Sequence, residues 1–260
     1  MTAAMGRRPD ALLLHTSDCH LGAGRGTSGP EEDAFVAMID AAIVQRVDTV
    51  VIAGDMFDHG LVPEELFDWT AAQLDRLPCP VVILPGNHDH VGDNSVHPRF
   101  DVENRCRNAY LLGEPNGSTA RPSGTPFAFW GRATREHDAN SRPLIDVPPP
   151  PADAWGIVVA HGAALNSNEP TSSPGSPIYP RDLEAIRGWD YVALGHLEHF
   201  YAVRRRPVPA YYCGDTYRSR DDRPGVVLVR FTEGEAAHVD WVALEPIDPT
   251  GPADRAAVTR

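Results

Sequence analysis

The stretch Val50-Val51-Ile52-Ala53-Gly54-Asp55-Met56-Phe57-Asp58 decides how the chain is organised. It begins as a run of apolar, mainly β-branched residues and ends abruptly at a glycine and a carboxylate. Such a run predicts a buried strand that opens into a loop. Ligand-binding groups of α/β proteins collect at the carboxyl ends of such strands. We therefore expect Asp55 to lie in a functional site.

The segments around this strand predict a parallel sheet that is crossed by helices. Residues 11–15 and 80–84 are apolar runs that predict further strands. Between residues 31 and 46, apolar side chains recur at three- and four-residue steps behind an acidic first turn, which predicts a helix. A second helix is expected over residues 63–77, which begin with proline. Strands that alternate with helices at this spacing require crossover connections and therefore parallel pairing.

The second half of the chain predicts shorter elements and an alternating tail. Strands are expected at residues 110–112, 127–130, 156–160 and 191–194, and a short helix at 181–187. Four apolar runs separated by short turns predict an antiparallel portion, at residues 200–203, 208–212, 226–231 and 237–243. We therefore expect an α/β fold of two facing sheets, with helices outside and the strand ends converging on one edge.

Length and composition suit one large domain. The 260 residues carry a formal charge of −13, which argues against a broad electrostatic grip on nucleic acid. The four cysteines are scattered, which favours reduced thiols in a cytoplasmic protein. No apolar run reaches membrane-spanning length, so no membrane partner is expected. We expect a disordered leader at residues 1–10, one domain at 11–245 and a tail at 246–260, and the oligomeric state stays open.

Acids, histidines and an asparagine follow five of the predicted strands. In an extended segment, residues two apart face the same way, so Asp18 and His20 can reach one ion. Asp55 can bind two ions, one with each oxygen. Oxygen and imidazole donors without thiolate favour Mn, Fe, Co or Zn. Each motif alone is more often a turn or a helix cap, but the ordered set predicts a two-metal site. The motifs are Asp18-x-His20, Gly54-Asp55-x-x-Asp58, Gly86-Asn87-His88-Asp89, His161-Gly162 and Gly195-His196-x-Glu198.

These motifs, in this order, resemble those of the calcineurin-like metallophosphoesterases. The SbcD-type DNA repair exonuclease branch is the most similar, through residues 14–22, 53–58, 191–196 and 212–215. The resemblance covers nearly the whole chain and implies a four-layer α/β/β/α sandwich with two divalent ions, most often manganese. It assigns one ion to Asp18, His20, Asp55 and residue 198, and the other to Asp55, Asn87, His161 and His196.

Two features depart from the family pattern. The last motif of the family reads Gly-His-x-His, whereas this chain has Glu198, whose carboxylate we still expect to bind the first ion. The second departure is length, because the chain is expected to stop near the end of the phosphoesterase core. It would then lack the capping domain that shapes DNA binding and the region that docks an SbcC-like ATPase. Neither DNA nor that ATPase partner therefore follows from the resemblance alone.

Two residues of the third motif are predicted to serve catalysis rather than metal binding. We expect His88 to lie over the leaving oxygen, where it stabilises charge or donates a proton. Asp89 is expected to orient His88 and to hold it cationic. Asp58 is a candidate to support His20 or His88, and ordinary loop capping explains Asp58 and Asp89 about equally well.

Three functions are compatible with these motifs. The resemblance favours a metal-dependent phosphodiesterase or nuclease that acts on DNA ends. The acidic charge suits a phosphodiesterase or phosphatase for small nucleotides. Glu198 suits a third class, a weakly catalytic metal-binding interaction module. Two arginine clusters, at residues 204–206 and 218–223, are candidate contacts for a phosphodiester backbone, although such runs are more often solvated strand ends.

Overall fold

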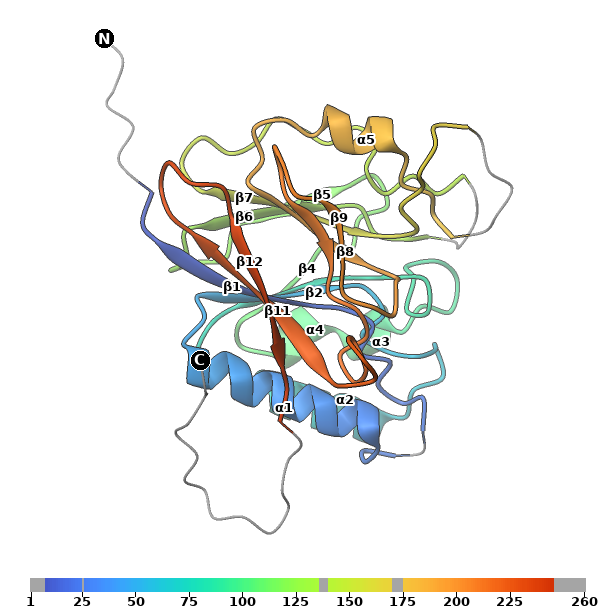
Figure 1. Ribbon diagram of the computed structural model, residues 1–260. Coiled ribbons are helices and arrows are strands. Elements are labelled where there is room, and N and C mark those ends of the chain that lie inside the picture. Colours follow the sequence, from blue (N-terminus) through green and yellow to red (C-terminus); the bar gives the residue numbers. More distant parts are fainter. Residues whose placement is uncertain (1–7, 25, 136–139, 170–174, 246–260) are drawn as a thin grey trace.

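Two six-stranded sheets face each other in the structure (Figure 1). This computed structural model describes residues 8–24, 26–135, 140–169 and 175–245. Strands β1 to β4 pair in parallel, and β11 joins β1 in the antiparallel sense, as β12 does with β11. The first sheet runs in the order β12 (His238–Ala243), β11 (Gly225–Phe231), β1 (Ala11–Thr16), β2 (Thr49–Ala53), β3 (Val81–Leu84) and β4 (Ala109–Leu111).

The second sheet is also mixed. Strands β6, β7, β8 and β10 are parallel neighbours, and β5 and β9 are antiparallel at the two edges. Its order is β5 (Ser118–Ala120), β6 (Phe127–Gly131), β7 (Trp155–His161), β8 (Tyr191–Gly195), β10 (Ala210–Tyr212) and β9 (Tyr201–Arg204).

Alternating side chains of β2 explain how the layers are built. Val50 and Ile52 belong to the core beneath helices α1 (Pro30–Gln45) and α2 (Glu64–Leu74). Val51 and Ala53 belong instead to the core between the two sheets. Successive side chains of a strand point to opposite faces, so one fully buried strand serves both cores. The strand is therefore central to the fold, as its sequence predicts.

The remaining helices complete the outer layers. Helix α5 (Pro180–Ala185) contributes Leu183 to a third core on the far side of the second sheet. Two short helices, α3 (His97–Phe100) and α4 (Val102–Arg105), lie between β3 and β4 in the chain. The predicted four-layer α/β/β/α sandwich is therefore confirmed. None of the described helices combines the length and apolar character that crossing a membrane requires.

The tail differs from its prediction in one respect. Its strands were expected to form one antiparallel portion, but they divide between the two sheets. Strand β10 is parallel to β8 on one side and antiparallel to β9 on the other. An alternating apolar pattern reports burial of one face and carries no information on strand direction. Strand β5, in a stretch of small and polar residues, was not predicted.

The ends of the chain fall largely outside the described residues. Residues 1–7 of the predicted leader and the predicted tail at 246–260 are among those not described, and the proposed domain limits stay a prediction. Arg8, within the predicted leader, is paired with Asp190 at 2.9 Å and with Glu233 at 3.0 Å.

Candidate metal centre

Strand ends from both sheets meet at a pocket of about 340 Å³. The backbone N–H of Asp18, after β1, donates to the carbonyl of Gly54, after β2, at 3.0 Å. The N–H of Gly162, after β7, donates to the carbonyl of Gly195, at the end of β8, at 3.2 Å. Predicted site residues that line the pocket are Asp18, His20, Asp55, Asp58, Asn87, His88, His196 and Glu198. His161 lies against Asp55 and Asn87, whereas the carboxylate of Asp89 binds the backbone of its own loop and of the neighbouring one.

The loops that carry the acids adopt left-handed backbone conformations. Asp18, His20 and Asp55 have φ angles of 51°, 48° and 52°. The expectation of an extended Asp18-x-His20 segment is therefore wrong. The two side chains still approach each other, with His20 Nε2 lying 4.0 Å from Asp18 Oδ1. Left-handed residues other than glycine are uncommon and often mark functional sites, where the surrounding structure holds the strain.

Asp55 and His161 form a buried pair at the centre of the site. His161 Nδ1 lies 2.9 Å from the carbonyl of Ala53, which can only accept, so Nδ1 carries the proton and donates it. The other ring nitrogen, Nε2, lies 3.2 Å from Asp55 Oδ2. A backbone carbonyl that fixes one imidazole nitrogen and leaves the other toward the site is the arrangement of metal-binding histidines.

Asn87 connects the two histidines at the ends of β7 and β8. Its Oδ1 lies 2.9 Å from His161 Nε2 and 3.0 Å from His196 Nδ1. The backbone N–H of His196 donates to Asp18 Oδ2 at 2.9 Å, which ties this end of the site to the first motif. Asp18, Asn87, His161 and His196, predicted from separate motifs, are thus brought together.

Burial sets the electrostatics of the centre. It raises the pKa of Asp18 to about 6. Burial alone would also raise the pKa of Asp55, but the adjacent His161 holds it well below its ordinary range. Burial lowers the pKa of His161, and the Asp55 carboxylate more than offsets this, so that the pKa rises to about 10. Carboxylates buried in this way require a positive charge nearby.

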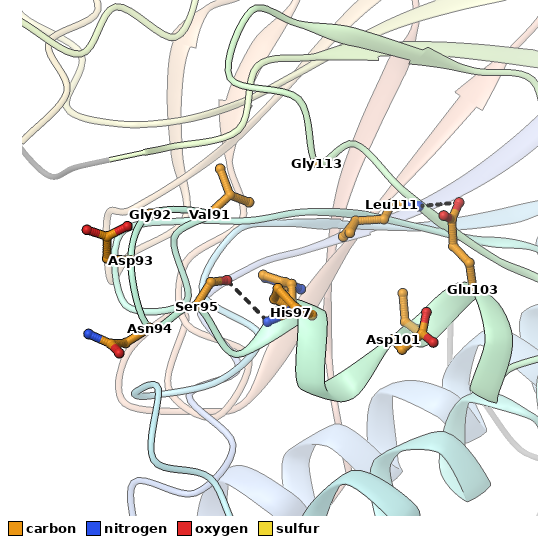
Figure 2. A pocket seen from close by; sticks show the side chains of 12 residues that line it. Val91, Gly92, Asp93, Asn94, Ser95, His97, Asp101, Glu103, Leu111 and Gly113 are labelled. Carbon is orange, nitrogen blue, oxygen red and sulfur yellow. Dashed lines mark hydrogen bonds between the residues drawn. The ribbon is translucent and has the colours of Figure 1, made fainter.

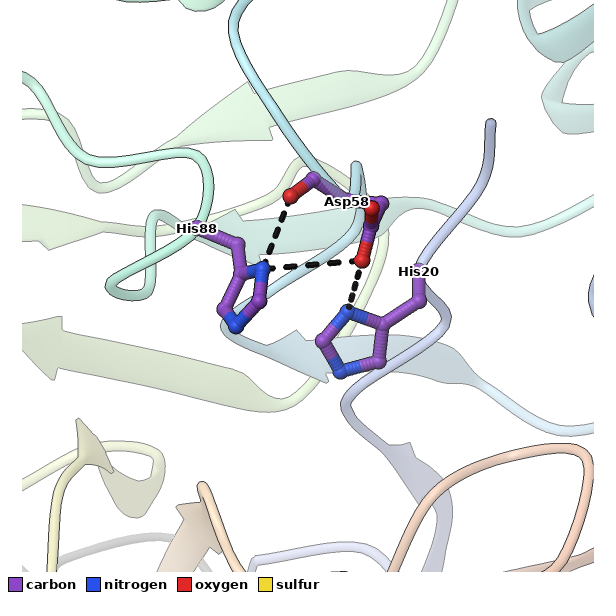
Figure 3. A group of neighbouring side chains, drawn as sticks. All are labelled: His20, Asp58 and His88. Carbon is purple, nitrogen blue, oxygen red and sulfur yellow. Dashed lines mark hydrogen bonds and ion pairs between the residues drawn. The ribbon is translucent and has the colours of Figure 1, made fainter. Parts of the chain in front are cut away.

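His20, Asp58 and His88 form a second group at the exposed side of the pocket (Figure 3). Asp58 Oδ1 lies 3.1 Å from His20 Nδ1, and the Asp58 carbonyl accepts a hydrogen bond from His88 Nδ1 at 2.7 Å. Asp58 therefore contacts both rings, through its carboxylate for His20 and through its backbone carbonyl for His88. Because each Nδ1 is occupied, the Nε2 atom is the one that each ring offers to an ion or a substrate.

Asp89 takes a role other than the one predicted. Its Oδ2 accepts hydrogen bonds from the backbone N–H groups of Met56 and Phe57, and its Oδ1 accepts one from Gly86 at 2.7 Å. The carboxylate is buried and directed into the loops, so the expected orientation of His88 by Asp89 is wrong in this structure. Sequence neighbours in a tight loop point in different directions, and here the Asp58 backbone binds the imidazole instead.

Two glycines allow the strand ends to approach this closely. A Cβ atom on Gly54 would lie 2.1 Å from His161 Nδ1. One on Gly86 would lie 2.1 Å from Asp55 Oδ1. Contacts this short do not occur between nonbonded atoms, so both positions require glycine if the ligands are to stay in place.

Asp215 is a site residue that the motifs did not predict. It is buried, lines the pocket and follows strand β10. The sequence signal is Gly214-Asp215 directly after an apolar run, the same pattern as Gly54-Asp55. Burial raises the pKa of Asp215 to about 6.

The donor set fits divalent metal ions. One oxygen or nitrogen atom from each of Asp18, Asp55 and His161 lies within 4.8 Å of the others. The same holds for Asp18, His20 and Asp215. Carboxylate, amide and imidazole donors without thiolate suit Mn, Fe, Co or Zn. These residues could hold two ions side by side.

A separate cavity of about 590 Å³ is lined by residues between Val91 and Gly113 (Figure 2). Leu111, His97 and Glu103 are in its lining, and the predicted metal ligands are not. The Ser95 hydroxyl accepts a hydrogen bond from the backbone N–H of His97, and the Glu103 carboxylate accepts one from the backbone N–H of Leu111. His97 Nε2 lies 3.5 Å from Asp89 Oδ2, so the cavity wall adjoins the loop that carries the metal site.

Comparison with known proteins agrees with this geometry. A family model described as calcineurin-like phosphoesterase matches residues 11–199. The chain is similar to the SbcD component of the nuclease SbcCD from Bacillus subtilis (strain 168), with 27% identity over 280 residues, 91% of this chain and 70% of that protein. It is also similar to the corresponding protein of Escherichia coli (strain K12), with 36% identity over 85 residues. That second match spans 30% of this chain and only 21% of the relative.

Solved structures share the fold at low sequence identity. TT1561 of Thermus thermophilus matches with a TM-score of 0.58 at 10% identity, covering 91% of this chain and 100% of that one. At this identity the likeness concerns the fold alone.

Proposed function

The chain belongs to the calcineurin-like phosphoesterase family, and from that premise we propose a two-metal phosphodiesterase of the nuclease type. Family membership makes the protein a hydrolase of phosphate esters with a centre for two divalent ions. Manganese as the metal, DNA as the substrate and the cytoplasm as the location are the finer parts of the proposal. The four cysteines are free thiols, which suits a reducing compartment.

The convergence of Asp18, Asp55, Asn87, His161 and His196 from both sheets carries the proposal. Each of these residues contacts at least one other through hydrogen bonds or ion pairs of 2.9 to 3.2 Å. Structural loop residues would bind backbone groups of the loops, as Asp89 does. These side chains instead face one another across the junction of the two sheets, which supports a shared ligand.

The chain's own residues suit phosphodiester hydrolysis. Two bound divalent ions would polarise the phosphoryl oxygens and lower the pKa of an attacking water. Asp55 and Asn87 would hold the bound ions through their side-chain oxygens. His88, held by the Asp58 carbonyl at Nδ1, would present Nε2 to the leaving oxygen and donate a proton or a hydrogen bond. The His88 side chain is 43% exposed, so an entering substrate can reach it.

The similarity to the SbcD component of a nuclease supports DNA as the substrate. A small nucleotide is the alternative, and the contacts of the arginine clusters favour it. Arg204 Nε donates to the carbonyl of Val208 at 2.8 Å, and Arg220 and Arg223 lie over the ring of Trp241. These guanidiniums already have partners, and the net charge of −13 weakens any wider attraction for DNA. An SbcC-like ATPase partner stays a proposal taken from the relatives.

Hydrolysis assays with Mn²⁺ test the proposal. We expect the chain to cleave bis-p-nitrophenyl phosphate, with Asp55→Asn inactive and Asp93→Asn, an exposed acid of the separate cavity, as active as wild type. Parallel assays with linear DNA and with cyclic dinucleotides then distinguish the two substrate classes. DNA binding that weakens steeply with salt would support the nuclease. If no phosphoester is cleaved while metal is bound, the interaction-module alternative replaces the proposal.

A further inference from the structure

The side chain at position 198 stays at the rim of the metal centre. Glu198 follows β8, at the position where the family motif has histidine. Its side chain is 60% exposed, and its Oε2 lies 3.3 Å from Arg218 Nη2. Among the described residues, none of the three groups of close potential ligand atoms includes Glu198. One predicted ligand of the first ion is therefore directed elsewhere.

Asp215 reaches the same region from the neighbouring segment. Its backbone N–H donates to the Glu198 carbonyl at 3.2 Å, so the two residues lie side by side. A parallel bridge to Ser17 brings it next to the first motif. The Asp215 side chain is 4% exposed, and its carboxylate lies within 4.8 Å of ligand atoms of Asp18 and His20.

We propose that Asp215, rather than Glu198, completes the first metal position with Asp18 and His20. The inference rests on the proposed function, because it concerns the same centre. Asp215 lies beyond residues 11–199, which the family model matches, so the family motifs do not assign it. Together with the shared ligand Asp55, this would give the position three carboxylates and one imidazole, a set richer in oxygen than one with a second imidazole, which favours Mn²⁺ or Fe²⁺ over Zn²⁺ there.

Arg218 contacts both Asp215 and Glu198. Its Nε lies 3.3 Å from Asp215 Oδ2, and its Nη2 lies 3.3 Å from Glu198 Oε2. The guanidinium thus binds one oxygen of Asp215 and leaves Oδ1 for an ion. It also pairs with Glu198 at the rim. Arg218 therefore orients the Asp215 carboxylate toward the centre and contacts the Glu198 carboxylate at the rim.

Metal content tests the assignment directly. Protein stripped with EDTA is reloaded with Mn²⁺, passed through a desalting column and analysed by mass spectrometry of the metal. We expect about two ions per chain for the wild type. Asp215→Asn is expected to retain about one, with the affinity for the lost ion at least about tenfold weaker. Glu198→Gln is expected to retain about two, as is Asp222→Asn, an exposed acid of the same segment.

A double variant strengthens the test. Adding Glu198→His to Asp215→Asn restores the family ligand, and we expect the lost ion to return. Loss of an ion from Glu198→Gln, or full loading of Asp215→Asn, would overturn the assignment, as would a wild type that binds a single ion. Thermal unfolding in EDTA shows whether each variant folds. If Asp215→Asn does not fold, Glu198→Gln alone decides, because the proposal requires it to keep both ions.

The readout separates this inference from the proposed function. A chain that holds both ions through Asp215 and cleaves no phosphoester upholds the ligand assignment and rejects the phosphodiesterase. A chain that cleaves phosphodiesters but loses an ion through Glu198→Gln upholds the enzyme and rejects the assignment.

Discussion

The Asp55 carboxylate accepts a hydrogen bond from the backbone N–H of His88 at 2.8 Å. Oδ1 makes this contact, and Oδ2 lies 3.2 Å from His161 Nε2. One side chain therefore connects the end of β2 with the loop after β3 and with the end of β7 in the facing sheet. The hydrogen bond to Asp55 fixes the backbone of His88, whereas the Asp58 carbonyl holds its ring.

Removal of the His88 ring is expected to abolish most turnover without loss of metal. His88→Ala should reduce kcat by about 10²-fold or more, because the residue acts on the leaving group. Its backbone N–H, which binds Asp55, remains in the variant, so the metal centre stays intact. Steady-state kinetics and metal analysis check this, with His238→Ala, an exposed histidine, as the control. Loss of metal together with activity would make His88 a ligand.

Asp89 is expected to act on stability rather than directly on chemistry. Asp89→Ala removes the acceptor of three buried backbone N–H groups, and we expect the free energy of unfolding to fall by about 2–4 kcal/mol. Activity should fall with it, because the loops that carry Asp55 and Asn87 lose their common anchor. Urea unfolding at pH 7.5 measures the change. Unchanged stability with lost turnover would restore the role predicted from the sequence, in which Asp89 orients His88.

Gly86 is expected to tolerate no side chain. The Cβ of Gly86→Ala would lie 2.1 Å from Asp55 Oδ1, so the carboxylate must move away from the position where it binds metal. We expect the Mn²⁺ affinity to weaken by about tenfold or more, as when other groups that position a ligand are lost. Titration calorimetry measures the affinity. Gly24→Ala is the matched control, because a Cβ there meets no atom within 4 Å; equal affinities in the two variants would refute the steric argument.

The sequence predicts those parts of the site in which each ligand directly follows an apolar run. Asp55 and His161 are of this kind, because a buried strand determines where its last residue lies. The directions of side chains within tight loops are harder to predict from the sequence. Asp18 and His20 depend on a left-handed backbone, and Asp89 binds backbone amides of another loop. Asp215 carries the same strand-then-Gly-Asp signal, but it stands where the family pattern expects only the closing strands. The pairing of Arg218 with Glu198 and Asp215 becomes apparent only when the chain is folded.

His15 provides a test of how pH acts on the core. The imidazole is fully buried on β1, and its Nδ1 lies 3.0 Å from the hydroxyl of Tyr191 on β8. Burial lowers the pKa of His15 from 6.5 to about 3, whereas the unfolded chain keeps the ordinary value. Burial also raises the pKa of Tyr191 well above its usual range, so the hydroxyl stays neutral.

The unfolded chain binds more protons than the folded one between pH 3 and pH 6.5, so stability falls as the pH falls through this window. The loss due to His15 alone is about 2 kcal/mol between pH 7.5 and pH 5. His15→Gln keeps a hydrogen-bonding group for Tyr191 and does not titrate, so we expect its unfolding free energy to fall less over the same interval. Urea unfolding of both proteins at the two pH values, in EDTA, gives the difference. Parallel pH profiles would mean that His15 is protonated in the folded core.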